Sequence, residues 1–183
     1  MVNSYKPELT KLQQGIVRLL FVKAGFSLNQ RGIARILDVS QPAVMKSLPK
    51  LEKQEIIKVE QDRESRRWAI ELNRDNQKTI QLKRADNLKQ IYESGFADFL
   101  EKEFAGATII LFGSYSKGED DVYSDIDIAI IGRKRKDVKL TEFHKKLERN
   151  INLNFYVSFK NITDKDLKDS ILNGIVLSGS VDL

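Results

Sequence analysis

The feature that most constrains this chain of 183 residues is a pair of short apolar segments joined by a polar loop. The first segment ends in Gly113-Ser114, and the second opens with an Asp-x-Asp sequence, Asp125 and Asp127. Residues two positions apart in a β-strand lie on the same face, so the two carboxylates are expected to project together. Paired carboxylates favour a hard divalent cation, Mg²⁺ or Mn²⁺.

The Gly-Ser end of the first segment suits a phosphate group. Gly113 lets a phosphate approach the backbone closely, and Ser114 with the N–H groups that follow it can donate hydrogen bonds to that phosphate. A metal beside a phosphate is the arrangement of phosphoryl and nucleotidyl transfer, in which the cation neutralises charge and aligns the attack. The loop is not a Walker motif, because Gly118 is followed by Glu119 where that motif requires lysine.

Over residues 88–183 the chain resembles the DNA polymerase β-like nucleotidyltransferases, in particular the minimal nucleotidyltransferases of prokaryotes. Their signature is a hydrophobic residue, Gly-Ser, about ten residues, and then Asp-x-Asp. Lys117 and Ser124 also fit this family. The resemblance implies that Asp125 and Asp127 are catalytic and bind the metal. It assigns a nucleoside triphosphate to Gly113, Ser114, Lys117 and Ser124.

The resemblance also implies a third catalytic carboxylate, on a later strand. In this chain the matching strand has no carboxylate at that place. In the strand expected over 151–159, Asn152 and Asn154 lie on the polar face, and one of them stands where an aspartate is expected. An amide is neutral and cannot act as a base, so nucleotide binding is better supported than turnover. Carboxylates that could substitute, if the fold brings one close, are Asp137, Glu148 and the cluster Glu119-Asp120-Asp121.

All of the excess positive charge, a net +5, lies in the first 75 residues. They contain 14 Lys and Arg against 9 Asp and Glu, whereas the remaining residues contain 17 of each. A basic segment joined to a neutral one suggests that the first part contacts a polyanion such as nucleic acid.

Apolar spacing in the basic segment predicts three helices followed by a β-hairpin. The expected elements are helices over 9–22, 29–37 and 40–51 and strands over 56–60 and 67–72. Ser40 is expected to cap the third helix, and Pro49 to kink or shorten it. This order resembles a winged helix-turn-helix, and residues 31–44 resemble the helix-turn-helix core of MarR-like regulators.

Such a module places its recognition helix in the major groove of double-stranded DNA. Gln41 can make two hydrogen bonds to adenine, and Lys46 or Lys50 can contact phosphate or guanine. The full set of predicted DNA contacts is Ser40, Gln41, Ala43, Lys46, Ser47, Lys50, Arg63, Arg66 and Arg67. A homodimer on a two-fold site is the natural extension. The alternative is a winged domain that contacts proteins.

The rest of the chain alternates strands and helices, which predicts an α/β domain with a small mixed sheet. Its expected elements are a connecting helix over 76–104, strands over 107–112, 126–131 and 151–159, and helices over 140–150 and 164–173, the last capped by Thr163. His144 is interpreted as a surface or packing residue. The predicted fold class is α+β with two domains: a winged helix-turn-helix over 1–75, a linker helix over 76–104, and a minimal nucleotidyltransferase domain over 105–183.

Composition excludes several other functions. The chain has no cysteine and one histidine, which excludes a disulfide scaffold, a thiolate metal site and a histidine-rich zinc centre. No apolar run approaches the roughly 18–20 residues of a membrane span, and the N-terminus has no signal-peptide core. These features predict a cytoplasmic protein with no membrane partner.

Three functional hypotheses follow, and the third requires no catalysis. The first is a DNA-binding transcriptional regulator whose C-terminal domain binds Mg-NTP and senses or transfers the nucleotide; its domain order resembles a set of archaeal regulators. The second is an active, antitoxin-like nucleotidyltransferase that modifies a partner protein or small molecule, with the winged helix as adaptor. The third is a catalytically inactive scaffold that dimerises through its α/β half.

Overall fold

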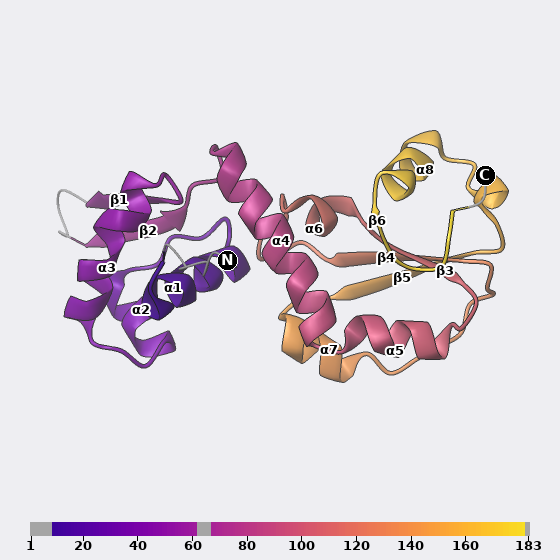
Figure 1. Cartoon of the computed structure of the whole chain (residues 1–183), viewed down its shortest axis with the longest axis horizontal. Helices are drawn as coiled ribbons and strands as arrows, with labels where there is room; N and C mark the ends of the chain where they lie inside the picture. Colours follow the sequence, from indigo (N-terminus) through magenta and orange to yellow (C-terminus); the bar gives the residue numbers. More distant parts are fainter. Residues whose placement is uncertain (1–8, 62–66, 182–183) are drawn as a thin grey trace, which may run out of the picture. The chain divides into compact units, whose positions relative to one another are not determined.

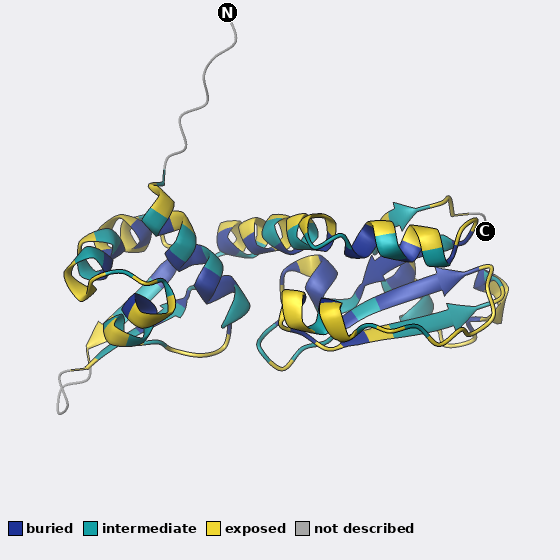
Figure 2. Cartoon of the chain, turned by 90° about the horizontal axis from the view of Figure 1, so that it is seen from below, coloured by how far each residue is buried: buried dark blue, intermediate teal, exposed yellow. Residues whose placement is uncertain are grey.

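The computed structural model describes residues 9–61 and 67–181. The chain divides into two compact units, Met1–Thr79 and Ile80–Leu183. Each unit encloses its own buried hydrophobic residues, and Figure 2 shows buried positions in the helices and strands of both units. Within the described residues, no helix is both long and apolar enough to cross a membrane.

The first unit consists of three helices and an antiparallel hairpin (Figure 1). Its elements are α1 (Lys11–Val22), α2 (Gln30–Ile36), α3 (Gln41–Lys53), β1 (Ile57–Gln61) and β2 (Trp68–Leu72). Thr10, Asn29 and Ser40 cap the three helices, each accepting a hydrogen bond from the backbone N–H three residues on. Such caps contribute about 1 kcal/mol each to stability. The predicted order of three helices and a hairpin is confirmed.

Helix α3 continues through Pro49 to Lys53, so the proline does not shorten it. Leu48 and Leu51, on either side of the proline, are buried in the core of the unit. Tertiary packing of an apolar face supplies most of the stability of a helix in a protein, and here that packing outweighs the hydrogen bond that proline cannot donate.

The second unit is built on a four-stranded sheet in the order β5-β4-β3-β6. Its elements are α4 (Gln77–Glu93), α5 (Phe96–Glu103), β3 (Thr108–Phe112), α6 (Gly113–Lys117), β4 (Ile126–Ile131), α7 (Thr141–Leu147), β5 (Ile151–Tyr156), the short 3-10 helix Phe159–Asn161, α8 (Lys165–Leu172) and β6 (Ile175–Ser178). Strands β4 and β5 are parallel, and the other pairs are antiparallel. The predicted small mixed sheet is therefore confirmed.

Alternation along the strands sends side chains into two separate cores. Leu111 and Ile128 pack with Phe96 on the side covered by α5 and α7, whereas Ile110 packs with Ile171 of α8. Figure 1 shows α8 on the opposite side of the sheet from α5 and α7. Side chains on β4 that alternate with Ile128 are thus directed to the α8 side.

The connecting helix predicted over 76–104 is wrong as a single helix. It is broken into α4 and α5 at Gly95, which adopts a left-handed conformation with φ of 76°. Helix α4 begins at Gln77, inside the first unit, and its remaining turns belong to the second. A glycine adopts this conformation without steric cost, which explains why the helix breaks there.

Two further predictions for the second unit need correction. The strand expected over 151–159 ends at Tyr156, and Asp164 rather than Thr163 caps α8 by accepting a hydrogen bond from the N–H of Leu167. An ionised carboxylate is a stronger acceptor at a helix start than a hydroxyl, because it also interacts with the helix dipole. Strand β6 was not predicted, since four residues carry little pattern and its pairing with β3 is long-range.

Replacing Gly118 by alanine is expected to destabilise the second unit by more than about 2 kcal/mol. Gly118 has φ of 78°, and an added Cβ would lie 2.5 Å from the backbone oxygen of Ile80 and 2.7 Å from the backbone nitrogen of Arg84, both on α4. Gly95→Ala is the matched control, because Gly95 has nearly the same φ but nothing within 4 Å of the added Cβ. Thermal unfolding of both variants measures the difference; equal losses would contradict the close approach of α4 to Gly118.

Candidate nucleotide and metal site

Asp125 and Asp127 lie at the start of β4, and the neighbouring strand places an amide between them. Strand β5 runs parallel to β4 with Asn152 opposite Asp127. The Nδ2 of Asn152 donates to Oδ2 of Asp125 at 3.1 Å and to Oδ1 of Asp127 at 3.2 Å. Asn152 is exposed and the aspartates are half-buried, so this carboxylate–amide cluster of three side chains is open to solvent.

The parallel register shows which of the two asparagines lies beside Asp125 and Asp127, a choice that the sequence did not settle. Asn154 lies opposite Ala129, two residues further along both strands, and its Nδ2 donates to the backbone oxygen of Ile128 at 3.5 Å. Asn152 is therefore the third side chain of the carboxylate–amide cluster, and Asn154 is its neighbour on the same face of β5.

Gly113 lies directly against this cluster. Strand β3 pairs with β4 so that Phe112 is opposite Asp127, and Gly113 follows with φ of 74°. A Cβ at Gly113 would come within 2.8 Å of Oδ2 of Asp127. The glycine thus leaves open a space that a side chain would fill, beside the carboxylate. Ser114 is half-buried in the first turn of α6, and Lys117 is exposed in its last turn.

Ser124 shapes the loop that leads into the Asp-x-Asp sequence. Its hydroxyl donates to the Asp121 carboxylate at 3.0 Å and accepts from the Asp121 backbone N–H at 3.0 Å. The structure therefore places the hydroxyl within a turn directly before Asp125. The sequence singled out Ser124 as a nucleotide contact, and the observed bonds give it a part in holding this turn.

A buried ion cluster fixes the same loop. The Asp120 carboxylate contacts the ammonium of Lys83 on α4, accepts a hydrogen bond from Asn87 Nδ2 at 2.6 Å, and contacts Arg149 at 3.3 Å. The side chains of Lys83, Asp120 and Arg149 are 1%, 0% and 3% exposed. Asn87 also donates to the backbone oxygen of Tyr115 at 2.9 Å, which ties the loop to α6.

Sequence reasoning missed Lys83, Asn87 and Arg149. A lysine on a long, charged helix has no local signal that distinguishes it from a solvated one. The pairing also settles one alternative: Asp120 is engaged in the ion cluster and is not a substitute for a third carboxylate in the carboxylate–amide cluster.

Two of the remaining candidates for a substitute carboxylate, Asp137 and Glu148, differ in position. Asp137 is almost fully exposed, 3.6 Å from Arg135. Glu148 borders a hollow of about 350 Å³ that Asp125 also lines. His144 lines the same hollow, and its Nδ1 lies 3.1 Å from the backbone oxygen of Arg149. The structure thus brings Glu148 and His144 to a hollow beside Asp125.

The carboxylate–amide cluster fits a divalent cation such as Mg²⁺. It offers two carboxylates and one amide oxygen, which are the oxygen ligands that Mg²⁺ takes, and Gly113 leaves space beside Asp127. In residues 9–61 and 67–181, no group of three or more His, Cys, Asp or Glu side chains is arranged to hold a metal ion. Phosphate oxygens and water would have to complete the coordination, as Mg²⁺ sites commonly require.

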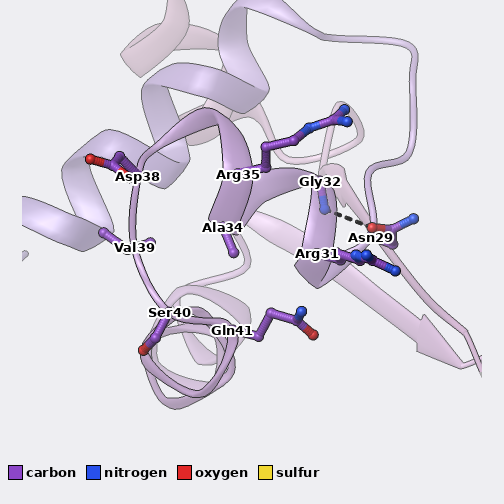
Figure 3. Close-up of a pocket in the computed structure, with 9 residues that line it drawn as sticks. All are labelled: Asn29, Arg31, Gly32, Ala34, Arg35, Asp38, Val39, Ser40 and Gln41. Carbon is purple, nitrogen blue, oxygen red and sulfur yellow. Dashed lines mark hydrogen bonds between the residues drawn. The ribbon is translucent and has the colours of Figure 1, made fainter.

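The first unit carries a separate hollow at the start of α2 and α3, with a volume of about 690 Å³. Figure 3 shows Arg31 and Arg35 of α2 around it, together with Gln41 at the start of α3. Asn29 accepts a hydrogen bond from the N–H of Gly32 at its edge. The sequence reasoning did not select either arginine, although both lie within its helix-turn-helix segment.

The predicted DNA contacts divide into exposed and structurally engaged side chains. Gln41, Lys46 and Lys50 are exposed on α3. The hydroxyl of Ser40 caps α3, and that of Ser47 donates to the Ala43 backbone oxygen at 2.9 Å. Ala43 itself is half-buried, and Arg67 is exposed just before β2, whereas Arg63 and Arg66 lie outside the described residues.

Comparisons with solved structures find proteins similar to part of the chain. A variant of ZitR from Lactococcus lactis is 24% identical with a TM-score of 0.41, over 56% of this chain and 66% of its own. The adhesin competence repressor AdcR from Streptococcus pyogenes is 23% identical with a TM-score of 0.42, over 57% and 72%. The MepR–DNA complex from S. aureus is 23% identical with a TM-score of 0.37, over 52% and 81%.

These TM-scores are below 0.5, so the winged-helix description rests on the helices and hairpin of this chain. The match spans slightly less than two thirds of the length of the ZitR chain. No curated protein matches the chain significantly.

A family model matches the other part of the chain. The model described as "Polymerase beta, Nucleotidyltransferase" covers residues 96–180. This span contains β3 to β6 and every residue of the carboxylate–amide cluster, together with Gly113 and Ser114. Residues 96–180 therefore carry a nucleotidyltransferase domain of the polymerase beta type.

Proposed function

We propose that the protein is a DNA-binding transcriptional regulator whose C-terminal domain binds a nucleoside triphosphate with Mg²⁺. The observation that carries the nucleotide part is the carboxylate–amide cluster beside Gly113, within the span of the nucleotidyltransferase domain. Asp125 and Asp127 would hold the cation, and the triphosphate would lie beside Gly113 and Ser114. A bound Mg²⁺ neutralises phosphate charge and orients the phosphate chain.

The residues of the second unit perform the rest of the binding. The buried ion cluster around Asp120 and the turn formed by Ser124 hold the loop before Asp125 in one conformation. Hydrogen bonds and ion pairs that hold ligating carboxylates in place typically change metal affinity by about 10–100-fold when they are removed. Asn152 holds the two like-charged carboxylates together by donating to both.

The DNA part of the proposal is supported by the exposed groups of the first unit. Gln41, Lys46 and Lys50 lie exposed along α3, and Arg31 and Arg35 line the hollow at the start of that helix. Positively charged side chains contact phosphates, and an exposed glutamine can contact a base edge. The excess charge of the first 75 residues has the sign that DNA requires.

The second candidate is an active nucleotidyltransferase that uses the winged helix as an adaptor, and the family-model match favours it. In that reaction, a hydroxyl oxygen of the acceptor attacks the α-phosphorus, the bond from that phosphorus to the bridging oxygen breaks, and pyrophosphate leaves. The acceptor proton would pass to a base in the hollow lined by Glu148 and His144.

The proposal is tested by titrating MgATP and MgGTP into the protein in a calorimeter and by measuring duplex DNA binding with and without the nucleotide. Saturable, metal-dependent nucleotide binding and salt-dependent DNA binding are expected. A labelled acceptor and released pyrophosphate without DNA binding would favour the second candidate. Absence of nucleotide binding at millimolar concentration would contradict both and favour an inactive scaffold.

Replacing Lys46 by alanine is expected to weaken DNA binding by a similar factor for all sequences. The slope of log affinity against log salt should fall by about 1, because one phosphate contact is lost. Lys53→Ala is the control, since Lys53 is also exposed on α3 but is not among the predicted contacts. Fluorescence anisotropy with labelled duplexes at several salt concentrations gives both slopes. An unchanged slope for Lys46→Ala would remove α3 from the DNA interface.

A further inference from the structure

We infer that Asn152 makes the carboxylate–amide cluster a site for one divalent cation, so that the protein holds a nucleoside triphosphate intact with a single metal ion instead of transferring its nucleotidyl group. This inference rests on the proposed nucleotide binding and specifies its chemistry. The structural basis is the position of the Asn152 amide, which donates to both Asp125 and Asp127.

The charge of the cluster matches one divalent cation. Asp125 and Asp127 contribute two negative charges, and Asn152 contributes none. Two-metal sites hold their cations roughly 3.5–4 Å apart, where the two ions repel each other strongly unless further anionic ligands lie around them. Of the two carboxylates in the preceding loop, Asp120 is buried against Lys83 and Arg149 and contributes no charge to the cluster, and the Asp121 carboxylate accepts hydrogen bonds from the Tyr123 N–H and the Ser124 hydroxyl.

The geometry assigns the neutral group to the third ligand position. One amide nitrogen lies 3.1 Å and 3.2 Å from an oxygen of each aspartate, so its side chain occupies the space that the two carboxylates share. Rotation about the last bond of Asn152 would exchange Nδ2 for Oδ1 and offer one neutral oxygen ligand to a cation bound there. A neutral oxygen can ligate the first cation, but it does not offset the positive charge of a second cation.

A site of this kind binds the nucleotide as an effector. With one cation, the triphosphate is neutralised and oriented, but no second cation activates an acceptor hydroxyl, and Asn152 cannot remove its proton. The ligand class is therefore a nucleoside triphosphate carrying one Mg²⁺ or Mn²⁺, recognised through its phosphates.

The test counts bound Mn²⁺ per bound nucleotide by electron paramagnetic resonance, with α,β-methylene-ATP as the probe because its α–β linkage cannot be cleaved. The wild-type protein is expected to bind one Mn²⁺ per nucleotide, and Asn152→Asp to bind two. Asn154→Asp is the matched control: it adds the same charge on the same face of β5, but the Asn154 amide donates to the backbone oxygen of Ile128 and not to the aspartates. It is expected to bind one.

The outcomes separate this inference from the proposed function. Two Mn²⁺ ions per nucleotide in the wild type, or one in a folded Asn152→Asp, would overturn the inference while leaving nucleotide binding in place. An equal gain of a second ion in Asn154→Asp would also overturn it, because position 152 would not be special. Absence of any Mn²⁺-nucleotide complex in the wild type would overturn the proposed function itself. If Asn152→Asp does not fold, the wild-type count still decides.

Discussion

Replacing Asp125 and Asp127 together by asparagine is expected to weaken binding of the Mg²⁺–nucleotide complex by roughly 100-fold or more, equivalent to about 2.7 kcal/mol or more. The substitution keeps the size of both side chains and removes both negative charges. Mg²⁺ gives up its water reluctantly and is held in proteins mainly by carboxylates, so neutral amides do not replace them. Isothermal titration with MgATP and MgGTP measures the effect.

This double variant should remain folded, because the two carboxylates are half-buried and repel each other. An unchanged or slightly higher melting temperature would therefore separate lost binding from lost structure. Asp137→Asn is the control, since Asp137 is exposed and is paired only at 3.6 Å with exposed Arg135 in the described part of the chain. Wild-type affinity in the double variant would move the metal site away from this cluster.

Replacing Asp120 by asparagine is expected to lower the free energy of unfolding by about 3–5 kcal/mol. The Asp120 carboxylate is fully buried and contacts both Lys83 and Arg149, and the substitution removes its charge without creating a cavity. A buried cation that loses its anion bears the cost of desolvation without the attraction that offset it. Urea unfolding at neutral pH measures the change.

Two comparisons make this prediction specific. Asp137→Asn removes an exposed ion pair and should cost less than about 1 kcal/mol. Lys83→Met should cost less than Asp120→Asn, because the contact between Asp120 and Arg149 remains. A loss in Asp120→Asn no larger than in Asp137→Asn would contradict the buried ion cluster. Since the buried ion cluster holds the loop before Asp125, the Asp120→Asn variant should also bind MgATP more weakly.

The motif residues could be predicted from the sequence because their signal is local. The apolar runs on either side of Gly113 and Asp125 have the alternation of strands, and an Asp-x-Asp sequence on a strand puts both carboxylates on one face. The helix cap at Ser40 is equally local, since a cap bonds to a backbone group three residues away. The break at Gly95 is local as well, since a glycine within a helical pattern favours an interruption there.

The ion cluster could not be predicted in this way. Asp120 is 37 positions from Lys83 and 29 from Arg149, and all three types of side chain are usually solvated. Only the packing of α4 against α6, which Gly118 permits, brings them together away from water. Sequence patterns give no information on which charges a fold buries.

The sequence by itself determined the two-part organisation, the strands that carry Asp125 and Asp127, and the basic character of the first unit, because these depend on local periodicity and on charge counts. The tertiary structure alone decided that Asn152 and not Asn154 completes the carboxylate–amide cluster. Both asparagines lie on the same face of β5, and they differ only in their partners across the parallel register with β4. That register is set by long-range pairing, and a shift of two residues would place Asn154 opposite Asp127 instead.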